Sequence, residues 1–303
     1  MKKYILHILL AVIALGATHT GASAQSDNLF PYPVPPDTMM SLQPRCDYII
    51  SRFWDRCNFE TAMLDKDRLN RAFGDWVSIM QHASADTVHA AIDKLLGRFV
   101  KKGPETLELA TLAENWLYSD TASIFSQEAY LPFARAAGHH KKLSKAERAR
   151  FLLHEQIIES SGLGAIVPNL EFIRPDGTKG HLHDINAESI LLFINDPDCD
   201  DCSVASTRLG VDYNAAQLIE RGELAIISIY PDEPDDRWRA EAERYPQTWT
   251  VGAIKDADTY FDLRSTPLFL FLDRNHKVSV NVLNIDQLLT AFRNVNIRHT
   301  RRQ

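Results

Sequence analysis

The sequence predicts a two-part fold, in which an all-helical N-terminal region precedes a C-terminal α/β domain built on a mixed sheet. Two observations predict it. Apolar residues recur at helical spacing up to about residue 161, and after Gly162 short apolar runs alternate with helical stretches. A length of 303 residues also suits two domains of ordinary size. The composition, with 45% hydrophobic and 24% charged residues, excludes a collagen, a coiled-coil rod and a disordered tail.

Residues 1–24 are typical of a cleavable signal peptide. Two lysines precede a mostly apolar run over 4–17, and the segment ends Ala22-Ser23-Ala24. That run is too short to span a bilayer comfortably, so we expect no membrane span after cleavage. We therefore expect an exported protein of the periplasm or cell envelope, where disulfides persist.

The formal net charge of −7 argues against nucleic acid or an anionic membrane surface as the main partner.

A proline-rich leader is predicted over residues 25–43, because its prolines at 31, 33, 35 and 36, followed by Pro44, disfavour regular helix. The helical domain then covers 44–161, and the α/β domain covers 165–303. We interpret the leader as a linker.

In the helical domain we predict five or six helices and no strand. Asp86 is the expected N-cap of one helix, which Gly103-Pro104 would end. Ser144 and Glu147 form a capping-box pattern ahead of another. The apolar positions of an earlier helix are Leu64, Phe73, Val77 and Met80.

In the α/β domain the apolar runs predict buried strands at 189–195, 224–230 and 268–273. A helical stretch over 199–221 separates the first two strands, and a hairpin followed by a helix over 286–294 closes the chain.

Cys199 and Cys202 form a C-x-x-C motif directly after a buried strand and at the start of a helix. In that position the motif indicates a redox pair, because the helix N-terminus stabilises a thiolate at Cys199 and Cys202 lies close enough to resolve a mixed disulfide. Two alternatives stay open. The pair could be an inert structural disulfide, or it could bind zinc or copper, although it lacks a second cysteine pair and ligand-spaced imidazoles.

The order of elements, together with Thr266-Pro267 at the start of a strand, resembles a thioredoxin fold. The run 167–172 and the segment Tyr260-Phe261-Asp262-Leu263 are similar to the TlpA/ResA-like branch of secreted thiol–disulfide oxidoreductases. The resemblance implies that Pro267 is a cis-proline facing the cysteines and that the backbone of Thr266 pairs with a bound substrate strand.

The same resemblance implies thiol–disulfide exchange with cysteine-containing exported proteins. Electrons would come from an upstream dithiol reductase, and neither a bound cofactor nor a metal is implied. The helical half, through its run 48–55, resembles an uncharacterised helical domain that precedes such modules in secreted Bacteroidota proteins. That second likeness carries no mechanism.

The cysteine motif departs from the family pattern, since Asp198, Asp200 and Asp201 stand around the two cysteines in place of the usual Trp, Gly and Pro. Phe193 and Ala205 occupy the positions where relatives carry a buried acid. The aspartates suit a helix start but oppose a neighbouring thiolate. We therefore expect a weakly activated Cys199 and a reductant-like or isomerase-like potential below about −180 mV. The competing hypothesis is a degenerate binding or scaffold protein.

Cys46 and Cys57 lie eleven residues apart in the helical region. On one straight helix they would be about 16 Å apart, too far to bond, whereas a bend could allow a bridge. Free buried thiols are an equal alternative. The histidines at 139, 140, 181 and 183 are interpreted as solvated surface residues rather than ligands.

Overall fold

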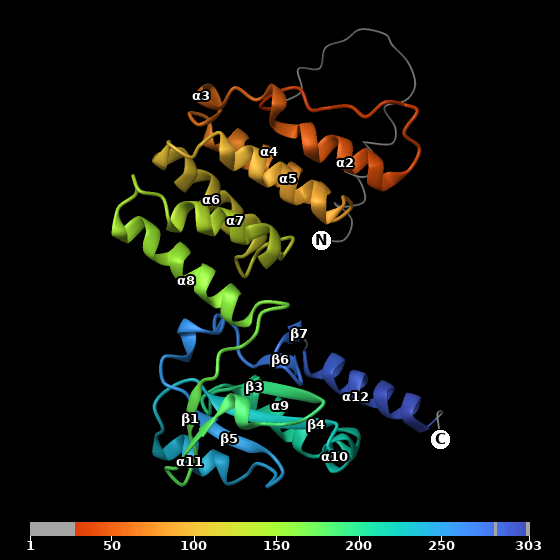
Figure 1. The fold of residues 1–303 in the computed structure, drawn as a ribbon, viewed down its shortest axis with the longest axis vertical. Helices are drawn as coiled ribbons and strands as arrows, with labels where there is room; N and C mark the ends of the chain where they lie inside the picture. The colour runs from red at the N-terminus through yellow and green to blue at the C-terminus, as the bar shows by residue number, and fades with distance from the viewer. Residues whose placement is uncertain (1–27, 282–283, 301–303) are drawn as a thin grey trace.

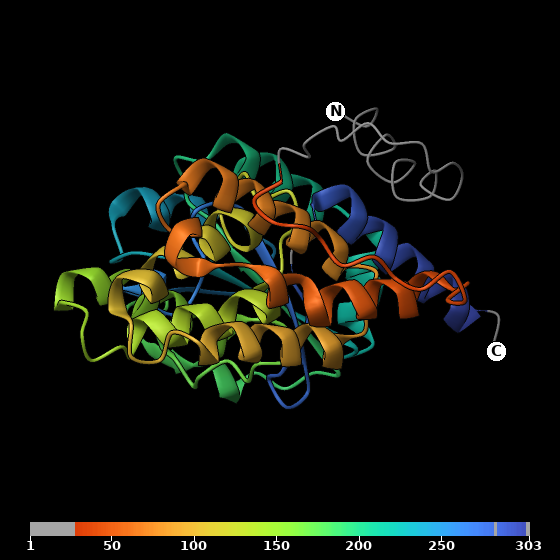
Figure 2. The same ribbon diagram turned by 90° about the horizontal axis from the view of Figure 1, so that it is seen from above.

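The computed structural model describes residues 28–281 and 284–300, and within them a helical region stacks on an α/β domain along the long axis of the molecule (Figure 1). Seen from above, the helical region lies over the α/β domain (Figure 2). The predicted signal peptide falls outside the described residues. None of the helices in the described ranges has the length and apolarity needed to cross a membrane.

The helical region holds seven α-helices among the described residues, one more than the upper expectation, because a single short turn forms an additional helix. They are α2 (Leu42–Arg52), α3 (Phe59–Ala62), α4 (Lys66–Met80), α5 (Ala85–Gly97), α6 (Gly103–Leu117), α7 (Gln127–Gly138) and α8 (Lys145–Ser161), with the 3₁₀ turn η1 (Phe53–Arg56) after α2.

Two predicted helix boundaries are wrong. The N-cap of α5 is Ser84, whose hydroxyl accepts the backbone N–H of Thr87, and Asp86 lies inside the first turn. Gly103 and Pro104 begin α6 rather than end α5, because proline fits the first turn of a helix, where its missing N–H is not needed. By contrast, the predicted capping box at the start of α8 is confirmed.

The core of the helical region is aromatic. Trp54 and Trp76 are both buried, so neither lines an open groove. Leu64 is wrong as a core residue, since it follows α3 in a turn and is 85% exposed. The leader has no helix or strand at 31–36, as expected. It is not only a linker, because Phe30 packs into this core and the hydroxyl of Tyr32 donates to Asp75.

In the described part of the α/β domain, the strands form a seven-stranded mixed sheet in the order β2-β1-β5-β4-β3-β6-β7. Its strands are β1 (Glu171–Ile173), β2 (Lys179–His181), β3 (Ser189–Ile194), β4 (Leu224–Tyr230), β5 (Thr250–Ala253), β6 (Leu268–Asp273) and β7 (Val278–Asn281). The central strand β3 pairs parallel with β4 and antiparallel with β6. This arrangement confirms the predicted fold class of a helical region followed by a helix-flanked mixed sheet. Strand β5 was not predicted from the sequence.

The side chains of β3 alternate between two apolar clusters, and α-helices of this domain cover the first of them. Leu191 and Phe193 pack with α9 (Asp200–Gly210), α10 (Tyr213–Glu220) and α12 (Ile285–Thr300). The single helical stretch predicted over 199–221 is thus two helices, because Asp212 caps a new one. The shorter α11 (Asp236–Ala242) buries Trp238 against Tyr230. The opposite face of β3 meets a cluster that includes Phe261.

Candidate functional site

The two cysteines of the motif lie at the carboxyl end of β3, where the chain turns into α9, and they form a disulfide. Cys199 is the N-cap of α9, and its Sγ accepts the backbone N–H of Cys202 at 3.1 Å. Cys199 is half-buried, whereas Cys202 is only 2% exposed. An N–H donor and the positive end of a helix dipole therefore meet at the more accessible sulfur, and both stabilise negative charge there.

The loop before β6 lies against this disulfide. The Thr266–Pro267 peptide bond is cis, as the resemblance implies. The carbonyl oxygen of Thr266 is 3.7 Å from Sγ of Cys199, and the hydroxyl oxygen of Thr266 is 3.6 Å from the same sulfur. The fold thus brings together two motifs that are 67 residues apart in the sequence.

The aspartates around the cysteines have different surroundings. The carboxylate of Asp198 pairs with the guanidinium of Arg237 at 2.5 Å, and Arg237 also binds Asp235. Asp200 and Asp201 lie exposed in the first turn of α9. The charge of Asp198 is therefore largely balanced locally, and Asp200 and Asp201 are left as the acids facing solvent beside Cys199.

The interior beside the cysteines is apolar. Phe193 is fully buried, with its ring stacked on Phe269 at a centroid distance of 5.1 Å, and Ala205 is 1% exposed. Neither position offers a carboxyl group that could move a proton to or from Cys202.

A buried polar network supports the loop that carries Cys199, and the sequence interpretation missed it. The Asn195 amide donates to the Ser228 hydroxyl at 2.8 Å and accepts the Tyr245 hydroxyl at 2.8 Å. Burial raises the pKa of Tyr245 to about 12, so this phenol stays a donor. The only signal in the sequence was a lone asparagine ending an apolar strand, which did not identify its partners.

The other two cysteines are free. Cys46 is buried in α2, and Cys57 is half-buried after η1, so the open question of a bridge between them is resolved in favour of thiols. Burial raises the pKa of both, and that of Cys57 rises to about 12. Neither thiol is ionised at neutral pH.

The histidines differ from the expectation of a uniformly solvated set. His140 is 8% exposed, because it lies in the turn that connects α7 to α8 and caps the backbone of Lys142. The ring of His183 stacks on that of His276 at 4.1 Å, and its Nε2 contacts the carbonyl of Val167 at 2.8 Å. Within 28–281 and 284–300 no group of three or more His, Cys, Asp or Glu is arranged to hold a metal ion.

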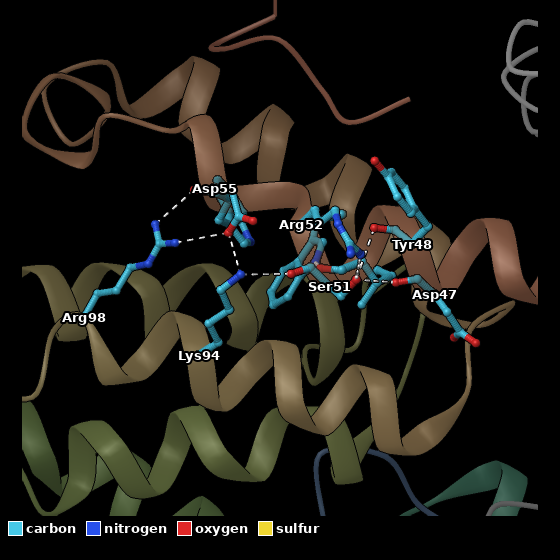
Figure 3. Close-up of polar contacts among 10 residues, drawn as sticks. Asp47, Tyr48, Ser51, Arg52, Asp55, Lys94 and Arg98 are labelled. Atoms are coloured by element: carbon cyan, nitrogen blue, oxygen red, sulfur yellow. Dashed lines mark hydrogen bonds and ion pairs between the residues drawn. The ribbon is translucent and has the colours of Figure 1, made fainter. Parts of the chain in front are cut away.

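A separate groove of about 530 Å³ lies between α2 and α5 in the helical region (Figure 3). Its cations are engaged with the chain itself. Of the two cations that line it, Lys94 donates to the carbonyl of Ser51 at 3.2 Å and pairs with Asp55 at 2.5 Å, and Arg52 donates to the hydroxyl of Ser51 at 3.0 Å. Next to the groove, Arg98 donates to the carbonyl of Trp54 at 2.9 Å. These carbonyls end α2 and η1, so Lys94 and Arg98 neutralise helix termini. We assign the groove a structural role.

Comparison with known proteins agrees with the fold. Residues 15–160 match the model of a domain of unknown function, DUF5106. A thioredoxin-like protein from Bacteroides caccae is similar over most of both chains, with 25% identity, a TM-score of 0.71, and coverage of 87% of this chain and 97% of that one.

Two shorter structures are similar to part of the chain. One is the C-terminal domain of an uncharacterised protein from Bacteroides fragilis, with 29% identity, coverage of 43% and 96%, and a TM-score of 0.40. The other is the thioredoxin domain of a thiol–disulfide oxidoreductase from Bacteroides vulgatus, with 20% identity, coverage of 44% and 96%, and a TM-score of 0.37. No curated protein matches. The similarity to the Bacteroides caccae structure and the geometry described above agree that the chain combines a helical region with a thioredoxin-like domain, which carries a C-x-x-C disulfide.

Proposed function

We propose that the protein is an exported thiol–disulfide oxidoreductase that exchanges disulfides with protein cysteines through Cys199 and Cys202. One observation carries this proposal. A half-buried sulfur at a helix N-cap is bonded to a buried one, and the carbonyl and hydroxyl of Thr266 lie beside it. An inert structural disulfide needs neither a sulfur at a helix N-terminus nor the carbonyl and hydroxyl of Thr266 beside that sulfur.

The proposed reaction runs from the reduced dithiol. The Cys199 thiolate attacks one sulfur of the substrate disulfide, so a mixed disulfide forms and the other substrate sulfur leaves as a thiolate that takes up a proton. Cys202, deprotonated by solvent, then attacks Sγ of Cys199 and releases the second substrate thiol. Two electrons pass from the cysteines to the substrate, and the intramolecular disulfide is the oxidised product. An upstream dithiol protein reverses the change.

The chain's own groups have defined roles in this scheme. The N–H of Cys202 stabilises the Cys199 thiolate at the 3.1 Å contact seen with the disulfide. The Thr266 carbonyl accepts from the backbone of an extended substrate, next to the attacked sulfur. Electrons pass between sulfur atoms, so the reaction as written uses no bound cofactor.

A second function, a scaffold or binding protein whose thioredoxin-like domain does not turn over, is favoured by one observation. The buried positions 193 and 205 hold Phe and Ala. Solvent would then have to deprotonate Cys202, which is slow for a thiol that is 2% exposed.

A trapping experiment separates the two functions. The Cys202→Ser variant, reduced and mixed with a peptide containing an intramolecular disulfide, is expected to accumulate a covalent 1:1 adduct through Cys199, because the resolving thiol is gone. Non-reducing electrophoresis and mass spectrometry detect the adduct. The double variant Cys199→Ser/Cys202→Ser is the control and should form none. Absence of the adduct with the single variant, together with no turnover by the native protein, would support the scaffold.

The reduction potential is a second test of the proposed site. We expect a value below about −180 mV, because Asp200 and Asp201 place negative charge next to the Cys199 thiolate. Replacing both by asparagine should make the potential more oxidising, by on the order of 10–30 mV. The Asp198→Asn variant should shift it less, because it removes one negative charge where the double variant removes two. Equilibration with glutathione buffers measures all three, and a potential near that of DsbA in the native protein would contradict the proposal.

A further inference from the structure

The loop that carries Thr266 makes contacts between the α/β domain and the helical region. Its anchor is Arg264, whose guanidinium reaches across 146 positions of sequence to Tyr118, the residue that ends α6. Nearby, α8 contacts the short turn η3 (Ala257–Thr259) that leads into the same loop. The helical region therefore contacts the α/β domain a few residues before Thr266, the residue that lies beside Cys199.

Arg264 completes a helix end that belongs to the other region. The last carbonyls of an α-helix have no partner within the helix and carry its negative dipole. Nη1 of Arg264 donates to the Tyr118 carbonyl at 2.8 Å, and the guanidinium lies 4.2 Å from the centre of the Tyr118 ring. Asp120, just beyond the helix, lies 3.5 Å from Nη1. One side chain thus supplies a C-cap, a cation–π contact and an ion pair.

The rest of the guanidinium is held within its own loop. Nε and Nη2 of Arg264 bind the two oxygens of Asp262 at 2.7 and 2.5 Å. Burial alone would raise the pKa of Asp262, but the bonds and charge of Arg264 outweigh it and the pKa is lowered. Asp262 is consequently ionised, and the fork-shaped pair fixes the orientation of Arg264.

The same short segment has a fixed point at each end. Phe261 is fully buried in the sheet core, and Thr266 lies against Cys199. Arg264 stands between them, three residues from the first and two from the second. A shift of Arg264 relative to α6 would therefore be absorbed by the backbone at 262–266, which includes the Thr266 carbonyl beside Cys199.

We infer that Arg264 is a positioning residue. By binding the end of α6 it holds its loop, and with it the Thr266 carbonyl beside Cys199, in place. The helical region would then help to position the proposed substrate-binding backbone. This inference rests on the proposed function for its kinetic consequences. The docking itself is a separate claim about the loop.

The test compares Arg264→Ala and Arg264→Lys with Arg150→Ala. Arg150 is a matched control, since it also binds a carboxylate, Glu114, and covers an aromatic ring, Phe151, but does so entirely within the helical region. With a disulfide-containing peptide as substrate, we expect Arg264→Ala to raise KM by about 5- to 10-fold with kcat within about twofold. Arg264→Lys should recover little, because an ammonium cannot reproduce the fork.

Two further measurements isolate the cause. Dithiothreitol is not a peptide and does not bind the Thr266 backbone, so it should reduce the Cys199–Cys202 disulfide at the native rate in all three variants. Hydrogen–deuterium exchange of the peptide covering 259–266 should accelerate several-fold in both Arg264 variants and stay unchanged in Arg150→Ala. An unchanged KM and unchanged exchange in Arg264→Ala would overturn the inference. If the native protein fails to turn over, the proposed function fails, while the exchange measurement still decides the docking claim.

Discussion

Replacing Cys199 by serine is expected to lower the rate of peptide disulfide exchange by at least about a thousandfold. In the proposed reaction the Cys199 thiolate is the attacking species, and a serine hydroxyl is not ionised at neutral pH. The half-buried position of Cys199 at the start of α9 makes it the sulfur that a substrate can reach. The measurement is kcat/KM with a disulfide-containing peptide and a thiol donor.

Cys57→Ser is the matched control for this loss. The Cys57 thiol is half-buried, and its pKa is raised by burial to about 12, so it supplies no thiolate at neutral pH. Exchange should therefore proceed at the native rate in this variant. If Cys199→Ser retained activity, or if Cys57→Ser removed it, the assignment of the attacking sulfur would be wrong.

The largest expected effect on stability comes from Phe193→Ala. Phe193 is fully buried on the central strand, where its ring stacks on Phe269 and meets Trp249 edge-on. Its removal leaves a cavity that strands on both sides of β3 cannot fill, and such truncations destabilise by about 3–5 kcal/mol. Urea unfolding measures the loss as a lower midpoint with an unchanged slope.

The Phe125→Ala variant provides the comparison, since it is the same substitution at a position that is 47% exposed, in the loop between α6 and α7. We expect a loss of less than about 1 kcal/mol there. Similar losses for the two variants would show that Phe193 does not support the sheet in the way described. A large loss at Phe193 would also explain why this strand carries no carboxyl group, since the position is needed for packing.

The sequence predicted those parts of the fold that depend on local pattern. The apolar run of β3 followed by Cys199 and Cys202 placed the disulfide at a strand end, because strand burial and helix onset are both visible in neighbouring residues. The proximity of Thr266 to Cys199 was expected only through a family resemblance, since nothing in either segment encodes a contact over 67 positions.

The remaining differences have identifiable physical causes. Strand β5 was missed because it is four residues long and only half of it is buried. Asp86 was predicted as an N-cap because it has the right chemistry, but Ser84 precedes it and takes the position. The contact between Arg264 and Tyr118 could not be predicted from the sequence, because an arginine two residues after an aspartate does not indicate a partner in another region.

The hydrogen bonds around Asn195 affect how far the turn after β3 would move when the Cys199–Cys202 disulfide is reduced. Its bonds to Ser228 and Tyr245, and the bond from the backbone N–H of Cys199 to the carbonyl of Asp196, hold the turn at the end of β3 through groups other than the two sulfur atoms. We therefore expect these bonds to persist when the disulfide is reduced. Structural change on reduction should then be confined largely to the cysteine side chains, which would favour rapid exchange in both directions in the proposed reaction.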